Sequence, residues 1–323
     1  MKRLLVSHND LDGISCLFLA WYFRDKLDIT EMISRDYEFA EDEEEFDYLQ
    51  LFDEILITDL SISEERTKAL RDKGIIVRFF DHHESSLWLK EDKDSVHSLE
   101  ECGTSLFWKN FVKPKISRYP IIIDQYVTLV DTYDMWKDED ELWNDAKDLN
   151  TVLYGIRDYS SKDALLSVRP FFQLMGTKFR KLSEWRWTEK EKEIIEKANK
   201  REEELYQKAL RELSIRTDKK GRKFGVFTLP AKISVIASRI LKEREDLDYV
   251  VIFNTYGGLT GRVSFRSRKM NLHELGLAKG HVLASGGVLT PDLSIKFLED
   301  ESYVFVYTDE YDEKNIKTAI ARI

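Results

Sequence analysis

The sequence has little of what marks a secreted or membrane protein. Its 323 residues contain two cysteines, Cys16 and Cys102, which cannot define a disulfide framework and have no cysteine neighbour that would suggest a zinc site. No apolar run approaches the roughly 20 residues of a membrane span. The apolar stretch near the N-terminus stops at Ser7, without the cleavage site of a secretion signal. We therefore expect a cytoplasmic protein with no membrane contact.

Positive charge is outweighed by negative charge. The 50 lysines and arginines face 60 aspartates and glutamates, which gives a formal net charge of −10. Proteins that coat long nucleic acids rely on a basic surface, so this balance disfavours such a role and leaves a small anionic substrate compatible. The hydrophobic content of 42% is sufficient for two cored domains in a chain of this length.

The first part of the chain alternates strand-like and helical segments. This alternation predicts right-handed crossovers and a mainly parallel sheet with helices on both faces. The predicted strands are residues 3–8, 29–36, 54–60 and 75–80. The predicted helices are residues 14–25, 41–51 and 63–72. The fold class is therefore α/β, and a further buried helix or strand is expected at residues 119–129.

The composition changes further along the chain. Aromatic residues between 171 and 187 are more typical of helix packing than of a nucleic-acid stacking platform. Residues 188–213 are dense in Glu, Lys and Arg and predict a long, mostly solvated helix. Strand-like segments then return, with one helix among them: strands 224–229, 249–254, 259–266 and 303–307, and helix 234–243. We expect a parallel-sheet catalytic domain at 1–185, a helical linker at 186–218 and a smaller mixed α/β substrate domain at 219–323.

Acidic and histidine residues gather at the ends of the apolar segments. They are His8, Asp10 and Asp12 after the first strand, Asp59 after the third, Asp81, His82 and His83 after the fourth, and Asp131 after the later segment. In a doubly wound sheet the carboxyl ends of the strands form the ligand crevice. A single aspartate after a strand is often a cap or turn residue, but four such clusters favour a shared site. The four clusters offer more potential ligands than one metal ion can use, and about as many as two divalent ions need.

The four clusters resemble the motifs of the DHH phosphoesterase family. The matching strings are Ser7-His8-Asn9-Asp10-Leu11-Asp12-Gly13, Thr58-Asp59-Leu60, Asp81-His82-His83 and Asp131-Thr132-Tyr133-Asp134. The family includes RecJ-type exonucleases, nanoRNase-type oligoribonucleases, cyclic dinucleotide phosphodiesterases and family II inorganic pyrophosphatases. The first string is most similar to the oligoribonuclease branch.

The resemblance implies a role for each residue of the clusters. It gives six ligands for two divalent ions: His8 and Asp10 for one ion, Asp12, His82 and Asp131 for the other, and Asp59 as the bridge. Asp81 and His83 would orient ligands or meet the phosphate, and together with Asp59 and His82 they form the expected catalytic set. Carboxylate and imidazole ligands suit Mn²⁺ best here, and Mg²⁺ is compatible. The helix that starts at residues 102–105 resembles one that could point backbone N–H groups toward an anion.

Two strings near the end of the chain resemble the DHH-associated substrate domain. They are Gly261-Arg262-Val263-Ser264-Phe265-Arg266-Ser267 and Gly280-His281-Val282-Leu283-Ala284-Ser285-Gly286-Gly287. In that module an arginine on a strand and a glycine-histidine loop hold the nucleotide phosphate. The resemblance implies six substrate-binding residues: Arg262, Arg266, Lys279, Gly280, His281 and Ser285.

These features together predict a metal-dependent phosphodiesterase. The expected substrates are short oligonucleotides, that is nanoRNA or dinucleotides, which two ions roughly 3.5 to 4 Å apart would help to hydrolyse to nucleoside 5′-monophosphates. Alternative substrates are cyclic nucleotides, cyclic dinucleotides and adenosine bisphosphate. A RecJ-type single-strand exonuclease, a pyrophosphatase and a non-catalytic nucleotide-binding protein are further alternatives, and a homodimer is compatible with the sequence.

Overall fold

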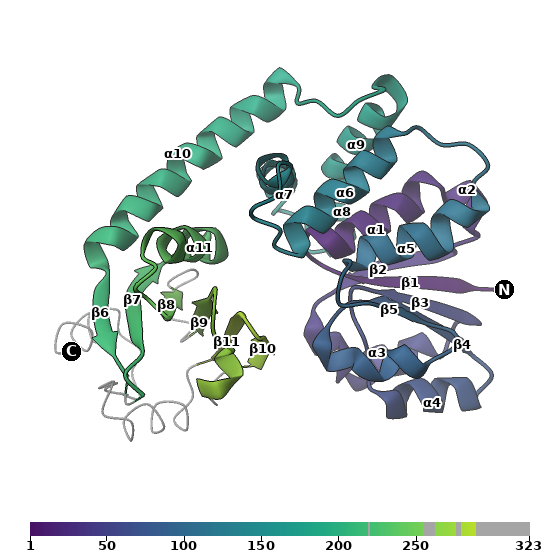
Figure 1. Ribbon diagram of the computed structural model, residues 1–323. Coiled ribbons are helices and arrows are strands. Elements are labelled where there is room, and N and C mark those ends of the chain that lie inside the picture. Colours follow the sequence, from purple (N-terminus) through teal and green to yellow (C-terminus); the bar gives the residue numbers. More distant parts are fainter. Residues whose placement is uncertain (219, 255–261, 276–278, 289–323) are drawn as a thin grey trace. The chain divides into compact units, whose positions relative to one another are not determined.

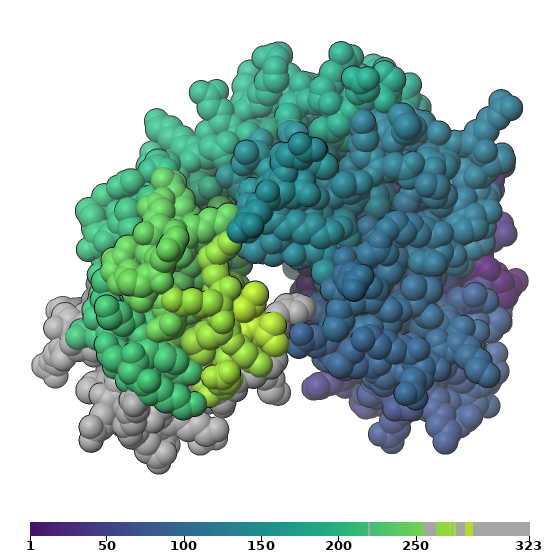
Figure 2. Space-filling model, viewed as in Figure 1, coloured from purple at the N-terminus to yellow at the C-terminus, as the bar shows by residue number. Residues whose placement is uncertain are grey.

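The computed structural model describes residues 1–218, 220–254, 262–275 and 279–288. They form two compact units, of which the first is Met1–Glu196 and the second begins at Lys197. In Figure 2 the atoms of the first unit are coloured purple to teal, and the described atoms of the second unit are coloured green to yellow. None of the helices in the described ranges combines the length and the apolar character needed to cross a bilayer. The predicted α/β fold class is confirmed.

A five-stranded parallel sheet forms the centre of the first unit (Figure 1). In the sheet order β2-β1-β3-β4-β5, the strands are β2 Glu31–Arg35, β1 Arg3–His8, β3 Glu54–Thr58, β4 Ile76–Asp81 and β5 Val96–His97. Every neighbouring pair is parallel. The strand order reverses at β1, which lies between β2 and β3. In such sheets ligands bind outside the carboxyl ends of the strands at the reversal.

Helices cover both faces of this sheet. They are α1 Leu11–Tyr22, α2 Arg24–Leu27, α3 Glu43–Leu49, α4 Glu64–Asp72, α5 Gly103–Phe107, α6 Ile122–Asp134, α7 Trp143–Ile156, α8 Ala164–Ser167 and α9 Arg169–Lys181. Successive strand residues point to opposite faces, so Leu5 and Leu56 join the core that contains α1, α6 and α9. Leu4 and Ile55 join the opposite core, with residues of α3 and α4. The sequence predicts either a helix or a strand at residues 119–129. Most of this segment is helical, because α6 begins at Ile122.

A six-stranded mixed sheet forms the described part of the second unit. In the order β10-β11-β9-β8-β7-β6, its strands are β10 Lys279–His281, β11 Ala284–Val288, β9 Arg262–Ser267, β8 Tyr249–Asn254, β7 Lys223–Leu229 and β6 Ser214–Thr217. Only β7 and β8 are parallel among these neighbours. Helix α11 Ile233–Glu243 packs on one face through Ile236 and Ile240. The strand expected at residues 303–307 lies outside the described residues.

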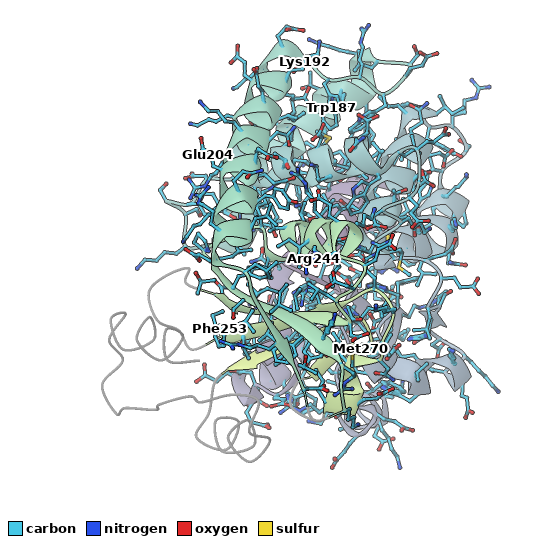
Figure 3. The ribbon with its side chains drawn as sticks, turned by 60° about the vertical axis from the view of Figure 1, so that its left-hand side comes forward. Trp187, Lys192, Glu204, Arg244, Phe253 and Met270 are labelled. Atoms are coloured by element: carbon cyan, nitrogen blue, oxygen red, sulfur yellow. The ribbon has the colours of Figure 1, made fainter. Side chains whose placement is uncertain are left out.

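Helix α10 Glu189–Glu212 covers most of the predicted linker, although the bounds of the three domains stay predictions. Its first turn is fixed to α9 by a buried ion pair: Nζ of Lys178 lies 2.8 Å from Oε1 of Glu191, and the two side chains are 2% and 1% exposed. The ammonium group also lies 4.6 Å and 4.8 Å from the ring centroids of Trp185 and Trp187. Figure 3 shows Trp187 just before α10, on which Lys192 and Glu204 stand. Packing is thus the role of these two tryptophans.

Replacing Lys178 with methionine should destabilise the first unit, because Glu191 would stay buried without its cation. Loss of one partner of a buried pair typically costs about 3 to 5 kcal/mol, so we expect a fall of about 3 kcal/mol in the free energy of unfolding, measured by urea denaturation and tryptophan fluorescence. Lys192→Met is the matched control, because Lys192 pairs with Glu189 on the surface, and it should change stability by less than about 1 kcal/mol. Equal effects of the two substitutions would contradict the anchoring role of Lys178.

Candidate metal centre

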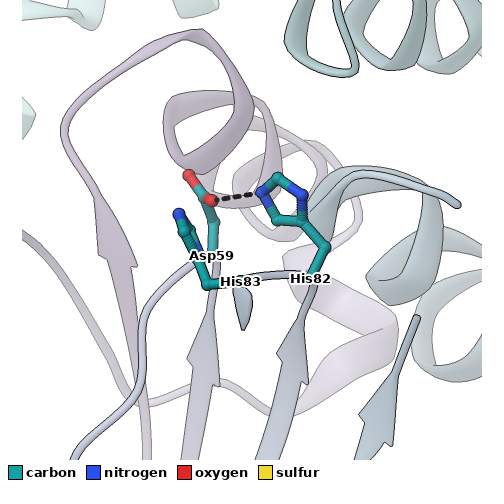
Figure 4. A group of neighbouring side chains, drawn as sticks. All are labelled: Asp59, His82 and His83. Atoms are coloured by element: carbon teal, nitrogen blue, oxygen red, sulfur yellow. Dashed lines mark hydrogen bonds and ion pairs between the residues drawn. The ribbon is translucent and has the colours of Figure 1, made fainter. Parts of the chain in front are cut away.

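Three neighbouring strands bring the predicted residues to one edge of the parallel sheet. His8 is the last residue of β1, Asp59 follows β3, and His82 and His83 follow β4. The strands β1, β3 and β4 are parallel neighbours, so their carboxyl ends lie side by side. Figure 4 shows Asp59, His82 and His83 converging from the ends of two of these strands.

The loop after β1 passes directly into helix α1. Asp10 caps this helix, because its Oδ1 accepts the N–H of Gly13 at 3.1 Å, and α1 therefore begins at Leu11 rather than at residue 14 as predicted. Asp12 then stands in the first turn of the helix and not in an extended loop. Gly13 is needed for close packing, since a Cβ there would lie 2.2 Å from the carbonyl oxygen of His8.

Asp59 occupies the middle of the cluster. Its φ of +54° lies in the left-handed region, which aspartate tolerates better than most residues. The carboxylate is 1% exposed and contacts two imidazoles, with Oδ2 at 3.5 Å from Nδ1 of His8 and Oδ1 at 3.3 Å from Nε2 of His82. Strained, buried residues of this kind concentrate at functional sites.

The side chains form a continuous set of potential metal ligands. Three overlapping groups offer ligand atoms that lie within 4.8 Å of one another: His8, Asp10 and Asp59; Asp12, His82 and Asp134; and Asp59, His82 and His83. The first two groups share no residue, so each can serve a separate ion. The third group joins them through Asp59 and His82.

Negative charge dominates this centre. Burial raises the pKa of Asp12 to about 7, and repulsion from Asp59 adds to the rise. Burial, together with the charge of Asp12, also raises the pKa of Asp134. Burial alone would lower the pKa of His82, but its contacts with Asp59 and Asp134 outweigh this and raise the pKa to about 11. The cluster therefore favours a cation at the imidazole nitrogens.

Two buried carboxylate oxygens show how a metal ion would fit. Oδ2 of Asp59 and Oδ2 of Asp134 receive no hydrogen bond of normal geometry from the described residues. An unsatisfied buried acceptor costs about 1 to 3 kcal/mol, and a charged one costs more. Coordination of a divalent cation would satisfy both atoms. Hard oxygen ligands with a few imidazoles suit Mn²⁺ or Mg²⁺.

The two aspartates in the last turn of α6 make different contacts. Asp134 lies beside the centre, with Oδ2 at 3.3 Å from Nε2 of His82. Asp131 instead accepts the N–H of Cys102 at 2.9 Å and pairs with Lys137. Asp131 belongs to none of the three ligand groups that the described residues form. Asp134 is therefore a candidate ligand that the sequence-based set did not include, whereas Asp131 holds the start of α5 through the N–H of Cys102.

The backbone N–H groups at the start of α5 also differ from the sequence-based expectation. The N–H groups of Gly103 and Thr104 each donate to the Asp12 carboxylate at 2.7 Å, so they are already bonded to an anion of the protein. The protein itself supplies the anion, and this fixes the orientation of Asp12. Gly103 must be a glycine here, since a Cβ would lie 2.9 Å from Oδ2 of Asp12 and from Cβ of Asp59.

Asp81 is buried beneath the centre and orients the residues that follow it. It accepts hydrogen bonds from Nδ1 of His83 at 2.7 Å and from the backbone N–H of His82 at 2.9 Å, as well as from the hydroxyl of Ser86. The hydroxyl of Tyr37 lies 3.2 Å from Nε2, the second ring nitrogen of His83. Protein groups therefore engage both nitrogens of His83.

Sequence reasoning missed three residues of this region. Asp134 had a signal, because it stands three residues after Asp131 and so shares a helical face with it. No sequence signal indicated Arg157. It follows α7, and its Nη2 donates to Oδ1 of Asn9 at 2.6 Å, which holds the loop between β1 and α1. Tyr37, in the 3-10 turn Tyr37–Ala40 after β2, also stands in no motif.

The predicted substrate residues lie on neighbouring strands of the second unit. Arg262 and Arg266 are on β9, Lys279, Gly280 and His281 on β10, and Ser285 on β11. The sheet pairs Gly280 with Ser285 and Ser285 with Phe265, so these backbones are adjacent. The side chains of Arg262, Lys279 and His281 lie outside the described part of the chain.

Arg266 is half-buried among neutral partners. Its guanidinium donates to the hydroxyl of Ser234 at 3.0 Å and to the carbonyl oxygens of Phe265 and Ser285 at 2.8 Å and 3.2 Å. Burial lowers its pKa to about 10, so the group stays charged at neutral pH. Ser285 itself is only 2% exposed, and it is the backbone carbonyl of Ser285 that accepts the hydrogen bond from Arg266.

Comparison with known proteins shows the same fold despite low sequence identity. No protein-family model and no curated protein matches the sequence. The DHH domain of a protein described as belonging to a family of ribosomal proteins matches with a TM-score of 0.61 and 13% identity, over 94% of this chain and 87% of its own. Exonuclease RecJ bound to manganese matches with a TM-score of 0.53 and 16% identity, over 100% and 91%. The pGpG-specific phosphodiesterase PggH from Vibrio cholerae gives 0.53 and 13%, over 93% and 97%.

The first unit is thus an α/β domain with acidic and histidine residues at the carboxyl ends of its parallel strands. Within the α/β class, the chain has the fold of the DHH and RecJ-like proteins. The resemblance that the four sequence motifs predict is confirmed at the level of the fold.

Exchange of Asp134 for asparagine should weaken Mn²⁺ binding more than the same exchange at Asp131. Asp134→Asn removes a charged ligand, whereas Asp131→Asn keeps an acceptor for the N–H of Cys102. Loss of a residue that only supports ligands typically costs 10- to 100-fold in affinity, so we expect a loss above roughly 100-fold for Asp134→Asn and a smaller one for Asp131→Asn, measured by titration calorimetry with Mn²⁺. A larger loss for Asp131→Asn would restore the original assignment.

Proposed function

We propose that this chain is a two-metal phosphodiesterase that hydrolyses short oligonucleotides, such as nanoRNA and dinucleotides, to nucleoside 5′-monophosphates. The observation that carries the proposal is the continuous ligand set around Asp59, with two separate groups of ligands joined at the ends of β1, β3 and β4. The fold supports it, since an exonuclease bound to manganese and a pGpG-specific phosphodiesterase share that fold. A protein that only bound nucleotides would have no need for both ligand groups.

The proposed ligands divide between two ions. One ion would be held by His8, Asp10 and Asp59, and the other by Asp12, His82 and Asp134, with Asp59 as the bridge. Bound divalent ions supply positive charge for a phosphoryl transition state and lower the pKa of water. Mn²⁺ is the proposed metal and Mg²⁺ the alternative, since oxygen ligands and imidazole suit both.

The protein holds these ligands in place through a set of fixed contacts. The N–H groups of Gly103 and Thr104 fix the Asp12 carboxylate. Arg157 holds the loop at Asn9. Asp81 holds the ring of His83 through Nδ1, and the hydroxyl of Tyr37 lies beside its Nε2. Such preorganisation lowers the cost of arranging charged groups during the reaction.

In the second unit, Arg266 is the proposed phosphate-binding residue. Its guanidinium is half-buried, charged and bonded to neutral oxygens of Ser234, Phe265 and Ser285. A guanidinium keeps its charge and attracts a phosphate, whose oxygens accept hydrogen bonds from its N–H groups. The backbone of Gly280 and the residues Lys279 and His281 are proposed to complete this site.

The reaction can be tested with a panel of substrates. Purified protein with Mn²⁺ should release nucleoside 5′-monophosphates from a diadenosine dinucleotide faster than it shortens a 20-nucleotide strand; the panel also contains cyclic dinucleotides, adenosine bisphosphate and pyrophosphate. Products are separated by chromatography. No product from any substrate would refute the enzyme proposal, and faster loss of the long strand would refute the preference for short substrates.

Two substitutions should separate chemistry from binding. Asp59→Ala should abolish turnover with the fold retained, because it removes the ligand shared by both ions. Arg266→Ala should mainly raise KM, by roughly 10- to 100-fold if one charged hydrogen bond to phosphate is lost. Arg244→Ala is the control in the second unit (Figure 3), because Arg244 pairs with the neighbouring Asp246. Full activity of Asp59→Ala, or an Arg266→Ala effect no larger than that of Arg244→Ala, would contradict these roles.

A further inference from the structure

Tyr37 contacts the metal centre without belonging to its ligand groups. Its ring packs against the imidazole of His8, with the centroids 4.4 Å apart and the planes tilted by 40°. Its hydroxyl lies 3.2 Å from Nε2 of His83. One side chain on the turn after β2 therefore touches a residue at the end of β1 and a residue that follows β4.

The exposure of Tyr37 distinguishes it from the residues it touches. Tyr37 is 55% exposed, whereas the side chains of His8 and His83 are 12% and 13% exposed. Single exposed aromatic residues are common on protein surfaces, but few of them bridge two histidines of a candidate active site. The exposed part of Tyr37 therefore lies next to the candidate metal centre, where a bound substrate can contact it.

We propose that Tyr37 is a substrate-positioning residue, whose exposed ring stacks on a nucleobase next to the phosphate that is cleaved. This inference rests on the proposed function and makes its substrate class more specific. Aromatic rings bind any base through its π face, so the contact would favour nucleotides without selecting their sequence. The ligands of a metal ion are engaged by the ion and the phosphate, so a preference for the base needs a further side chain beside them.

The ring and the hydroxyl of Tyr37 each have a partner of their own. The hydroxyl holds His83 and the ring holds His8, so the exposed part of the ring is kept at a fixed place beside the centre. A rigid aromatic ring loses little conformational freedom when it binds a base. Pyrophosphate has no base and would gain nothing from this ring, so the proposal predicts selection against it.

The test compares two variants on matched substrates. Tyr37→Leu and Tyr37→Phe are assayed with Mn²⁺ on diadenosine dinucleotide and on analogues in which hydrogen replaces one base or the other. We expect Tyr37→Leu to reduce kcat/KM on the intact dinucleotide by roughly 5- to 150-fold, mainly through KM, and to have little effect on the analogue that lacks the stacked base. Tyr37→Phe keeps the ring and should stay near the wild type in KM.

Controls make the outcomes distinct. Tyr119→Leu alters a tyrosine just before the N-terminal end of α6, whereas Asp134 stands at the C-terminal end. Tyr119 packs beside Trp108, so its replacement should leave the kinetics unchanged. If Tyr37→Leu reduces kcat/KM equally on the intact dinucleotide and on both analogues, or on none of them, base stacking is refuted. Thermal unfolding of each variant checks that the fold is retained.

A binding measurement keeps this inference separate from the proposed reaction. Adenosine 5′-monophosphate and ribose 5-phosphate are titrated into the wild type and into Tyr37→Leu with Mn²⁺ present. Stacking predicts that the wild type prefers the base-containing ligand and that Tyr37→Leu loses this preference. If the wild type cleaves no dinucleotide but shows this result, the proposed reaction fails and the stacking site stands; equal preference in both proteins refutes the stacking site.

Discussion

The excess of buried carboxylate around Asp59 is the constraint on which the rest of the first unit depends. Parallel strands deliver Asp59 and two histidines to one edge, and α1 and α6 add Asp12 and Asp134 to the same place. Like charges so close together raise one another's pKa unless positive groups compensate. Part of the compensation is built in, because the N–H groups of Gly103 and Thr104 bind Asp12. The remaining charge is what a pair of divalent cations would balance.

The sequence predicts the strand ends well for a physical reason. In a parallel sheet every strand ends at the same edge, so His8, Asp59 and His82 could be grouped without knowing any distance. The choice between Asp131 and Asp134 could not be made in this way, since both lie on one face of α6 and a small rotation of the helix decides which one reaches His82. The hydrogen bonds from the N–H groups of Gly103 and Thr104 to Asp12 could not be predicted either, because they depend on how the start of α5 packs against α1.

Residues that act through long-range contacts were out of reach of sequence reasoning altogether. Arg157 holds Asn9 across 148 positions of the chain, and Tyr37 touches His83 across 46. Neither belongs to a motif, and neither residue type is unusual after a helix or a strand. Arg157 contacts the loop that follows β1, and Tyr37 contacts the last residue of β1 and the segment that follows β4. Loops are where the fold leaves freedom, so contacts that restrict them cannot be predicted from the alternation of strands and helices.

The overall charge of the protein and the local charge of its sites act together on substrate length. Each phosphate of a strand gains from nearby cations only within about a Debye length, some 8 to 10 Å at ordinary salt. A dinucleotide fits within that range of a metal centre or of Arg266. Every further phosphate of a longer strand would extend over a protein whose net charge is −10, where it gains no attraction and meets repulsion. The attraction would therefore saturate after the first phosphates while the repulsion grows with length, and this balance supports the short substrates of the proposed function.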